Sequence, residues 1–318
     1  MNKKLRLRFI DDLSYPVSVV EDPYFDYQLS LCPGGIEDWK RLKEGIEKEY
    51  EGNPELFLQA YYEVREKMIQ DLQGSEKFKE AVIPEVDRKE VARSKDIYNE
   101  EYAGRKKVYV SIDLKKANVQ AFAHTDPELF GWDGGDSEEV WQADVLWKNF
   151  VVKHTGKEKK VLRWYCEKSK YLRQVVFGNV KPKKQIGIEK WMVWEQAKEF
   201  MKVYPEVSLV MASADEVIFE MEEEPGKLVT RVPWVDTKIQ PFRLTSIPFE
   251  TGSGNTIRVY KREMIGTGKV DYKCIPRNYY PQIWCLLNGE ECREEGLAFY
   301  YEKEIACFIR RLKIKEGE

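Results

Sequence analysis

The spacing of hydrophobic and polar residues changes twice along the chain. Residues 1 to about 35 mix short alternating apolar runs with prolines, which predicts strands or loops packed on another part of the protein. From Ile36 to about residue 100, apolar residues recur at helical spacing between acids and lysines, which predicts helices. Beyond Met221 the pattern becomes mostly β. We therefore expect an α+β fold with a mostly helical N-terminal portion (1–100), a central antiparallel sheet with helices (101–224) and a β-rich C-terminal portion (225–318).

The C-terminal portion shows short apolar runs separated by turn residues, and it closes with a run of helical character. Its strands are expected at 228–232, 242–247, 257–260, 270–274 and 282–287, and the last helix is expected at 302–312.

In the central portion a long helix is expected at 188–204, just before the hairpin described next.

Two stretches of the central portion place acids at the ends of predicted strands. Residues 108–113 alternate in strand fashion and stop at Asp113, and a helix-like run to Phe122 follows. Residues 208–221 predict a hairpin with Asp215 and Glu216 at its turn, although the turn lacks the Asn-Gly or Asp-Gly pair that short hairpins favour. Neighbouring strands would bring Asp113 and Asp215 together, and two such carboxylates repel one another unless cations lie between them.

A pair of Mg²⁺ ions held in this way can clamp the attacking and leaving oxygens of a phosphoryl transfer. The alternative is structural: Asp113 would cap a helix, and Asp215 with Glu216 would form an ordinary solvated turn.

The most basic part of the chain is 157–190, where aromatic residues alternate with lysines and arginines. Basic and aromatic side chains together suit the phosphates and bases of nucleotides. The alternative is a lysine-rich solvated helix, which is usually the better explanation of a charge run taken by itself.

Composition narrows the classes of function. A formal net charge of −3 over 318 residues gives no global electrostatic case for nucleic acid, so such a case depends on local patches. The apolar runs are too short to span a membrane and the first residues lack a signal-peptide pattern, so we expect an intracellular protein, cytoplasmic by default. The six cysteines form no C-x-x-C pair and the chain has two histidines, which predicts reduced thiols and no structural zinc.

Three segments, in this order, resemble the palm and fingers motifs of family A nucleic-acid polymerases and their single-subunit RNA polymerase relatives. Residues 113–130 resemble the first palm motif, an aspartate at a strand end followed by a helix. Arg173, three further residues, Phe177 and Gly178 resemble the fingers-helix pattern, and 214–220 resemble the last palm motif, where His-Asp-Glu precedes an apolar strand. The resemblance covers about a third of the chain and implies that the central sheet is palm-like.

The chain departs from that family at several points. The region between Asp113 and Asp215 is shorter than the usual fingers, and Ala214 stands where the family has histidine. Asn118 stands where DNA-polymerising members carry a glutamate that excludes the ribose 2′-hydroxyl, so the choice of sugar stays open. The run 213–219 also resembles the Ser-Asp-Glu motif of tRNA-histidine guanylyltransferases, but their glycine- and phenylalanine-rich first motif is absent.

The resemblance implies a Mg²⁺-dependent nucleotidyltransferase or polymerase that transfers nucleotides from NTP or dNTP to a 3′-hydroxyl of DNA or RNA. Two Mg²⁺ ions, or Mn²⁺ in their place, would bind Asp113 and Asp215. Glu216 would be a third catalytic residue that supports the site or polarises a ligand. The substrate-binding residues would be Lys170 and Arg173 for the phosphates, Phe177 for the base and Asn118 near the sugar.

Two other functions remain open on the sequence. The protein could be a non-catalytic nucleic-acid-binding or replication accessory protein with a palm-like scaffold, in which Tyr279, Tyr280 and Trp284 serve as stacking residues. It could also be a metal-dependent nuclease, which needs an activated water in place of a sugar hydroxyl.

Overall fold

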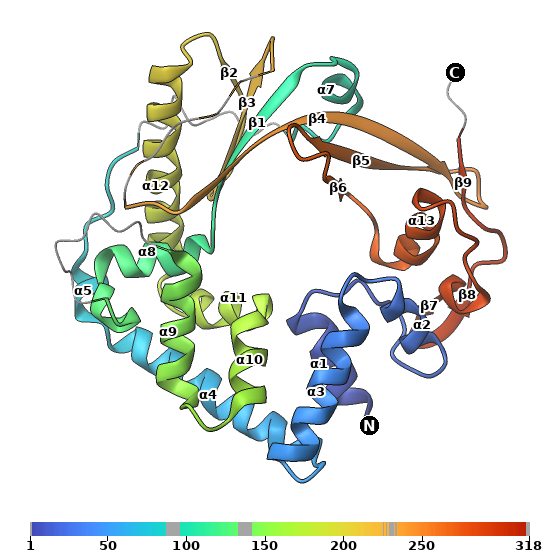
Figure 1. Cartoon of the computed structure of the whole chain (residues 1–318), viewed down its shortest axis with the longest axis horizontal. Coiled ribbons are helices and arrows are strands. Elements are labelled where there is room, and N and C mark those ends of the chain that lie inside the picture. Colours follow the sequence, from blue (N-terminus) through green and yellow to red (C-terminus); the bar gives the residue numbers. More distant parts are fainter. Residues whose placement is uncertain are drawn as a thin grey trace.

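A single antiparallel sheet, backed by helices, organises the molecule (Figure 1). The computed structural model describes residues 2–86, 96–132, 142–224 and 234–315, together with 226, 228 and 232. The sheet has seven strands in the order β2-β3-β1-β4-β5-β6, with β9 paired to β4, and β7 and β8 form a separate pair. The mixed α+β fold predicted from the sequence is confirmed.

The strands are β1 Val108–Leu114, β2 Ser208–Ala212, β3 Glu216–Met221, β4 Thr237–Glu250, β5 Thr256–Met264, β6 Val270–Lys273, β7 Ala298–Tyr301, β8 Glu304–Cys307 and β9 Lys313–Ile314. The α-helices are α1 Lys3–Asp12, α2 Tyr24–Ser30, α3 Gly35–Glu49, α4 Pro54–Gly74, α5 Glu76–Glu80, α7 Glu100–Gly104, α8 Ala117–Thr125, α9 Ala143–Thr155, α10 Lys160–Lys168, α11 Lys170–Gly178, α12 Pro182–Val203 and α13 Tyr280–Leu287. Short 3₁₀ segments are η1 Pro127–Phe130, η2 Arg277–Tyr279 and η3 Glu294–Leu297.

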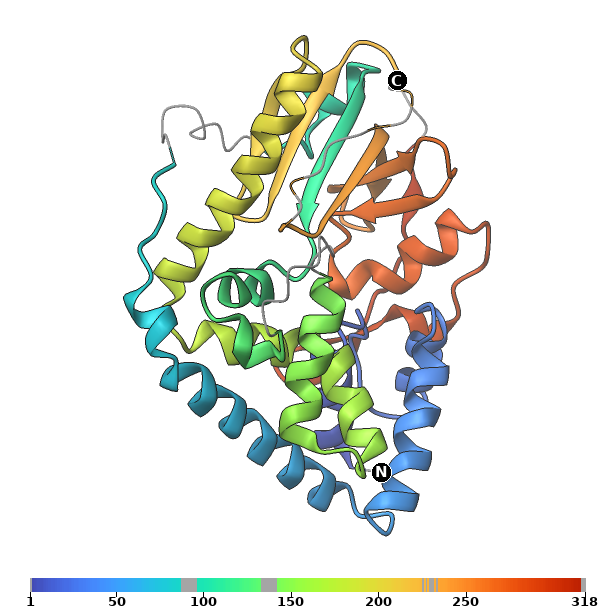
Figure 2. The ribbon, with the colours of Figure 1, turned by 60° about the vertical axis from the view of Figure 1, so that its left-hand side comes forward.

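Strand β1 lies between β3 and β4 and is buried on both faces. Its residues Val108, Val110 and Ile112 join the main core, and helix α12 packs along β1 and β3 (Figure 2). Tyr109 points to the opposite face, where it meets Tyr102 of α7. Successive side chains of β1 therefore enter two different hydrophobic clusters, one on each face of the sheet.

Both carboxylate-bearing segments belong to this sheet, as predicted. In the antiparallel pairing of β1 with β3, Asp113 is the partner of Glu216, and on the other side of β1 it is the partner of Lys238 of β4. The backbone N–H of Leu114 also donates to the carbonyl of Asp215 at 2.8 Å. The end of β1 is thus fixed against the turn between β2 and β3.

The prediction of strands or loops for the first 35 residues is wrong for α1 and α2. The side chain of Asn2 accepts from the N–H of Leu5 and caps α1. Leu5 and Phe9, four residues apart, are both fully buried. Their spacing suits a helix as well as an alternating strand, and the cap favours the helix.

The N-terminal helices do pack on another part of the chain, as expected. Gln28 of α2 donates through Nε2 to the carbonyls of Glu295 and Ala298, both at 3.0 Å. The first and last portions lie side by side in Figure 1 (blue and red). No helix in the described part of the chain is long and apolar enough to cross a membrane.

Several predictions for the C-terminal portion need correction. The expected boundary at 224 cuts through one sheet, since β4, β5 and β6 continue the sheet that holds β1. The segment 282–287 is helical, in α13, with Pro281 in its first turn. The helix expected at 302–312 is absent, and β8 occupies 304–307 after a turn in which Glu302 and Lys303 have positive φ. The strand expected at 228–232 falls largely outside the described residues.

Candidate functional site

A polar cavity of about 460 Å³ opens where β1 ends, between the β2–β3 turn and helices α8, α11 and α12. Five of the residues singled out in the sequence line it, although they come from four separate elements. They are Asp113, Asn118, Lys170, Arg173 and Asp215. Helix α12 adds Gln185 and Glu189, which the sequence analysis missed.

The carboxyl group of Asp113 lies half-buried beside two other acids. Burial, together with the charges of Glu216 and Asp215, raises the pKa of Asp113 to about 6, against the opposing effects of Lys238 and Arg262. A carboxyl group in such a position is stabilised in its ionised form by a bound cation.

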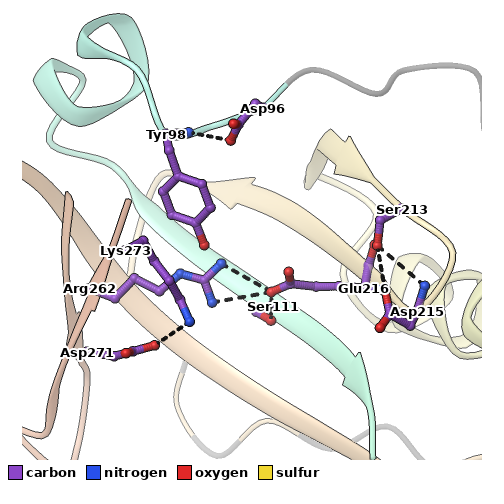
Figure 3. Close-up of polar contacts among 9 residues, drawn as sticks. All are labelled: Asp96, Tyr98, Ser111, Ser213, Asp215, Glu216, Arg262, Asp271 and Lys273. Atoms are coloured by element: carbon purple, nitrogen blue, oxygen red, sulfur yellow. Dashed lines mark hydrogen bonds and ion pairs between the residues drawn. The ribbon is translucent and has the colours of Figure 1, made fainter. Parts of the chain in front are cut away.

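The turn that carries Asp215 is held by Ser213. Its Oγ accepts from the N–H of Glu216 at 2.9 Å and donates to Oδ1 of Asp215 at 3.0 Å (Figure 3). The N–H of Ser213 donates to the carbonyl of Glu216 at 2.8 Å. Ser213 therefore supplies the turn chemistry that the missing Asn-Gly pair would have supplied.

Glu216 does not belong to the residues that line the cavity, contrary to its predicted place among the catalytic residues. Its Oε1 accepts from Oγ of Ser111 at 2.6 Å and lies 3.3 and 3.2 Å from Nη1 and Nη2 of Arg262 (Figure 3). A carboxylate engaged in this way supports the strands beneath the site and is not a free ligand. Arg262 is far away in sequence, and no local pattern pointed to it.

The cavity also holds positive charge without an acidic partner. Arg173 forms no ion pair with any described residue, and its Nε is buried without a hydrogen-bond partner among them. Burial lowers the pKa of Arg173 to about 10, and burial followed by the charge of Arg173 lowers that of Lys116. Lys170 likewise has no ion-pair partner in the described chain, so this side of the cavity suits an anion.

The prediction that Phe177 stacks on a base is wrong. Its side chain is fully buried in an aromatic cluster with Phe122, Phe130, Trp147 and Phe150. It lies on the side of α11 opposite to the solvent and anchors that helix.

Asn118 lines the cavity, and its Oδ1 accepts from the N–H of Val119 at 2.9 Å. The aromatic residues considered for stacking in the C-terminal portion pack within the protein. Tyr279 stacks on Phe308 with ring centroids 4.4 Å apart, and Tyr280 on Trp284 at 5.7 Å.

Mg²⁺ is held in proteins mainly by oxygen ligands. Among the described residues, no group of three or more histidine, cysteine or acidic side chains is placed to hold a metal ion. Mg²⁺ in nucleotide-dependent sites commonly uses one or two carboxylates and takes its other ligands from phosphates and water. Asp113 and Asp215, two carboxylates that line one cavity, fit that pattern.

No protein-family model, no curated protein and no solved structure matches the chain. The interpretation of the site therefore depends on its own geometry and charges.

Proposed function

We propose that the protein is a Mg²⁺-dependent, palm-type nucleotidyltransferase or polymerase that transfers a nucleotide from NTP or dNTP to a 3′-hydroxyl of DNA or RNA. The observation that carries the proposal is the juxtaposition in one cavity of Asp113 and Asp215 with Lys170 and Arg173. Carboxylates for a metal beside cations without partners are the complement of a metal–triphosphate complex.

In this proposal Asp113 and Asp215 would hold Mg²⁺, with two ions at full occupancy or Mn²⁺ in their place. When bound, such a metal would supply positive charge to the triphosphate and would lower the pKa of the attacking hydroxyl. Arg173 and Lys170 bind the phosphates. Because Arg173 has no acidic partner among the described residues, no ion pair has to break when an anion enters. Glu216, fixed by Ser111 and Arg262, keeps β3 and the Asp215 turn in place.

The cations favour transfer over the nuclease alternative. A nuclease needs the carboxylates and an activated water, whereas a transferase must also hold the charged tail of a nucleotide. A purely structural scaffold gains nothing from burying Asp113 near two other acids, because that arrangement costs stability.

Transfer of a labelled nucleotide onto an oligonucleotide primer, with Mg²⁺ or Mn²⁺ present, tests the proposal. Asp113→Asn and Asp215→Asn are expected to abolish transfer at saturating Mg²⁺ while circular dichroism shows an unchanged fold. Asp71→Asn, on α4 and outside the cavity, is the matched control and should behave like the wild type. If both cavity variants keep wild-type activity, the site assignment is wrong.

A further inference from the structure

Helix α12 forms a wall of the cavity that is built from hydrogen-bond acceptors. Gln185 and Glu189 stand one helical turn apart and both line the cavity. They lie in the first turns of α12 and are only 8% and 7% exposed, which is unusual for polar side chains. Neither belongs to a motif recognised in the sequence.

The hydrogen bond within this pair leaves one acceptor, Oε1 of Gln185, without a partner among the described residues. Nε2 of Gln185 donates to Oε1 of Glu189 at 2.8 Å, which fixes the orientation of the amide. Oε1 of Gln185 is then buried with no hydrogen-bond partner among the described residues. A buried acceptor without a partner costs free energy, and a ligand that brings a donor would remove that cost.

The wall lies beside the carboxylates of the site. The pKa of Glu189 is raised by burial and, to a smaller extent, by the charge of Asp215, so the two carboxylates are close enough to interact. In a nucleotide the group next to the metal-bound phosphates is the sugar. A sugar hydroxyl is a donor of the kind that this wall lacks.

We propose that the Gln185–Glu189 pair selects ribonucleoside triphosphates, with the ribose 2′-hydroxyl donating to this acceptor wall. The inference rests on the proposed function, because it places the sugar by way of the phosphate and metal sites. A 2′-deoxynucleotide leaves the acceptors without a donor, and sites built to bond a hydroxyl discriminate against analogues that lack it.

Calorimetric titration of ATP and 2′-dATP into the full chain, with Ca²⁺ in place of Mg²⁺ to prevent turnover, tests the inference. The wild type is expected to bind ATP roughly tenfold more tightly than dATP. Gln185→Met keeps the length of the side chain and removes the acceptor, and it should bring the ratio close to one. Gln196→Met is the matched control, since Gln196 is fully buried on the same helix, also has a buried Oε1 without a partner among the described residues, and does not line the cavity.

The outcomes separate the two proposals. Equal affinity for ATP and dATP, or a preference that survives Gln185→Met, overturns the sugar selection and leaves the nucleotidyltransferase standing. Failure of both nucleotides to bind overturns both. If Gln185→Met does not fold, Glu189→Gln is the second variant, because it removes the charge, replaces one acceptor oxygen by a donor and keeps the size. It should still reduce the ratio, and an unchanged ratio in that variant overturns the inference.

Discussion

Arg262 of β5 reaches across β4 and β1 to bond the carboxylate of Glu216 on β3. Both terminal nitrogens of the guanidinium contact the same oxygen, and the group also lies over the rings of Tyr98 and Phe242. Arg262 is 6% exposed. The pair therefore connects the C-terminal half of the sheet to the strand that begins directly after Asp215.

Removing one member of this pair should destabilise the protein. Arg262→Met leaves Glu216 as a charge without its partner, and we expect a loss on the order of 3 kcal/mol in the free energy of unfolding measured with urea. The double variant with Glu216→Gln removes both charges and should recover part of the loss. A double variant no more stable than Arg262→Met would show that the pair is not the source of the effect.

Arg173→Ala should weaken the use of nucleotide with little effect on folding. The loss of a phosphate contact is expected to lower kcat/KM by the equivalent of about 2–4 kcal/mol. Arg163→Ala, on α10 and paired with Glu167, removes the same group outside the cavity and should leave kcat/KM unchanged. Equal affinity of wild type and Arg173→Ala for triphosphate, with Mg²⁺ present, would remove Arg173 from the site.

Phe177→Ala should act on stability and not on base recognition. Truncating a fully buried phenylalanine costs about 3–5 kcal/mol, which thermal or urea unfolding will show. The fraction that stays folded should bind triphosphate with wild-type affinity. A raised KM with unchanged stability would instead restore the stacking role predicted from the sequence.

Asp12 should make stability depend on pH. It is fully buried between Arg8 and Tyr165, and burial raises its pKa from 3.8 to about 6. Because the folded pKa exceeds the unfolded one, its contribution is present below about pH 4 and is lost as the pH rises to about 6. The difference, about two pKa units, corresponds to up to about 3 kcal/mol.

Asp12→Asn should remove this part of the slope of unfolding free energy against pH between about 4 and 6. Asp11→Asn, which changes the exposed neighbour, is the control and should retain the slope. Parallel curves for the wild type and Asp12→Asn would contradict the assignment.

The central strands of the sheet were predictable because their hydrophobic pattern fits a strand and no other element. Alternating residues at 108–113 and the hairpin at 208–221 could only bury their apolar side chains as strands. The spacing of Leu5 and Phe9 fits a helix and also an alternating strand. The Asn2 cap is the feature that distinguishes the helix from the strand. At 282–287 an apolar run without a clear period became a helix because Pro281 suits a first helical turn.

The charged residues of the site were predictable from the sequence, but the residues that contact them were not. Asp113, Asp215 and Arg173 each follow a local pattern that survives in the fold. The partner of Glu216 was not predictable, because Arg262 is brought to it by the strand order, which local spacing does not encode. Gln185 and Glu189 belong to no motif recognised in the sequence, and their spacing of four residues is the one local sign of a shared helix face.

The central position of β1 has a consequence during synthesis. Its sequence is translated before either neighbour, because β3 ends at Met221 and β4 at Glu250. At ribosomal rates of about 5–20 residues per second, the last residue of β4 is synthesised on the order of ten seconds after the last residue of β1. For that interval the nascent chain exposes an apolar strand with two open edges, so chaperone demand on this protein should be set by the order of its strands.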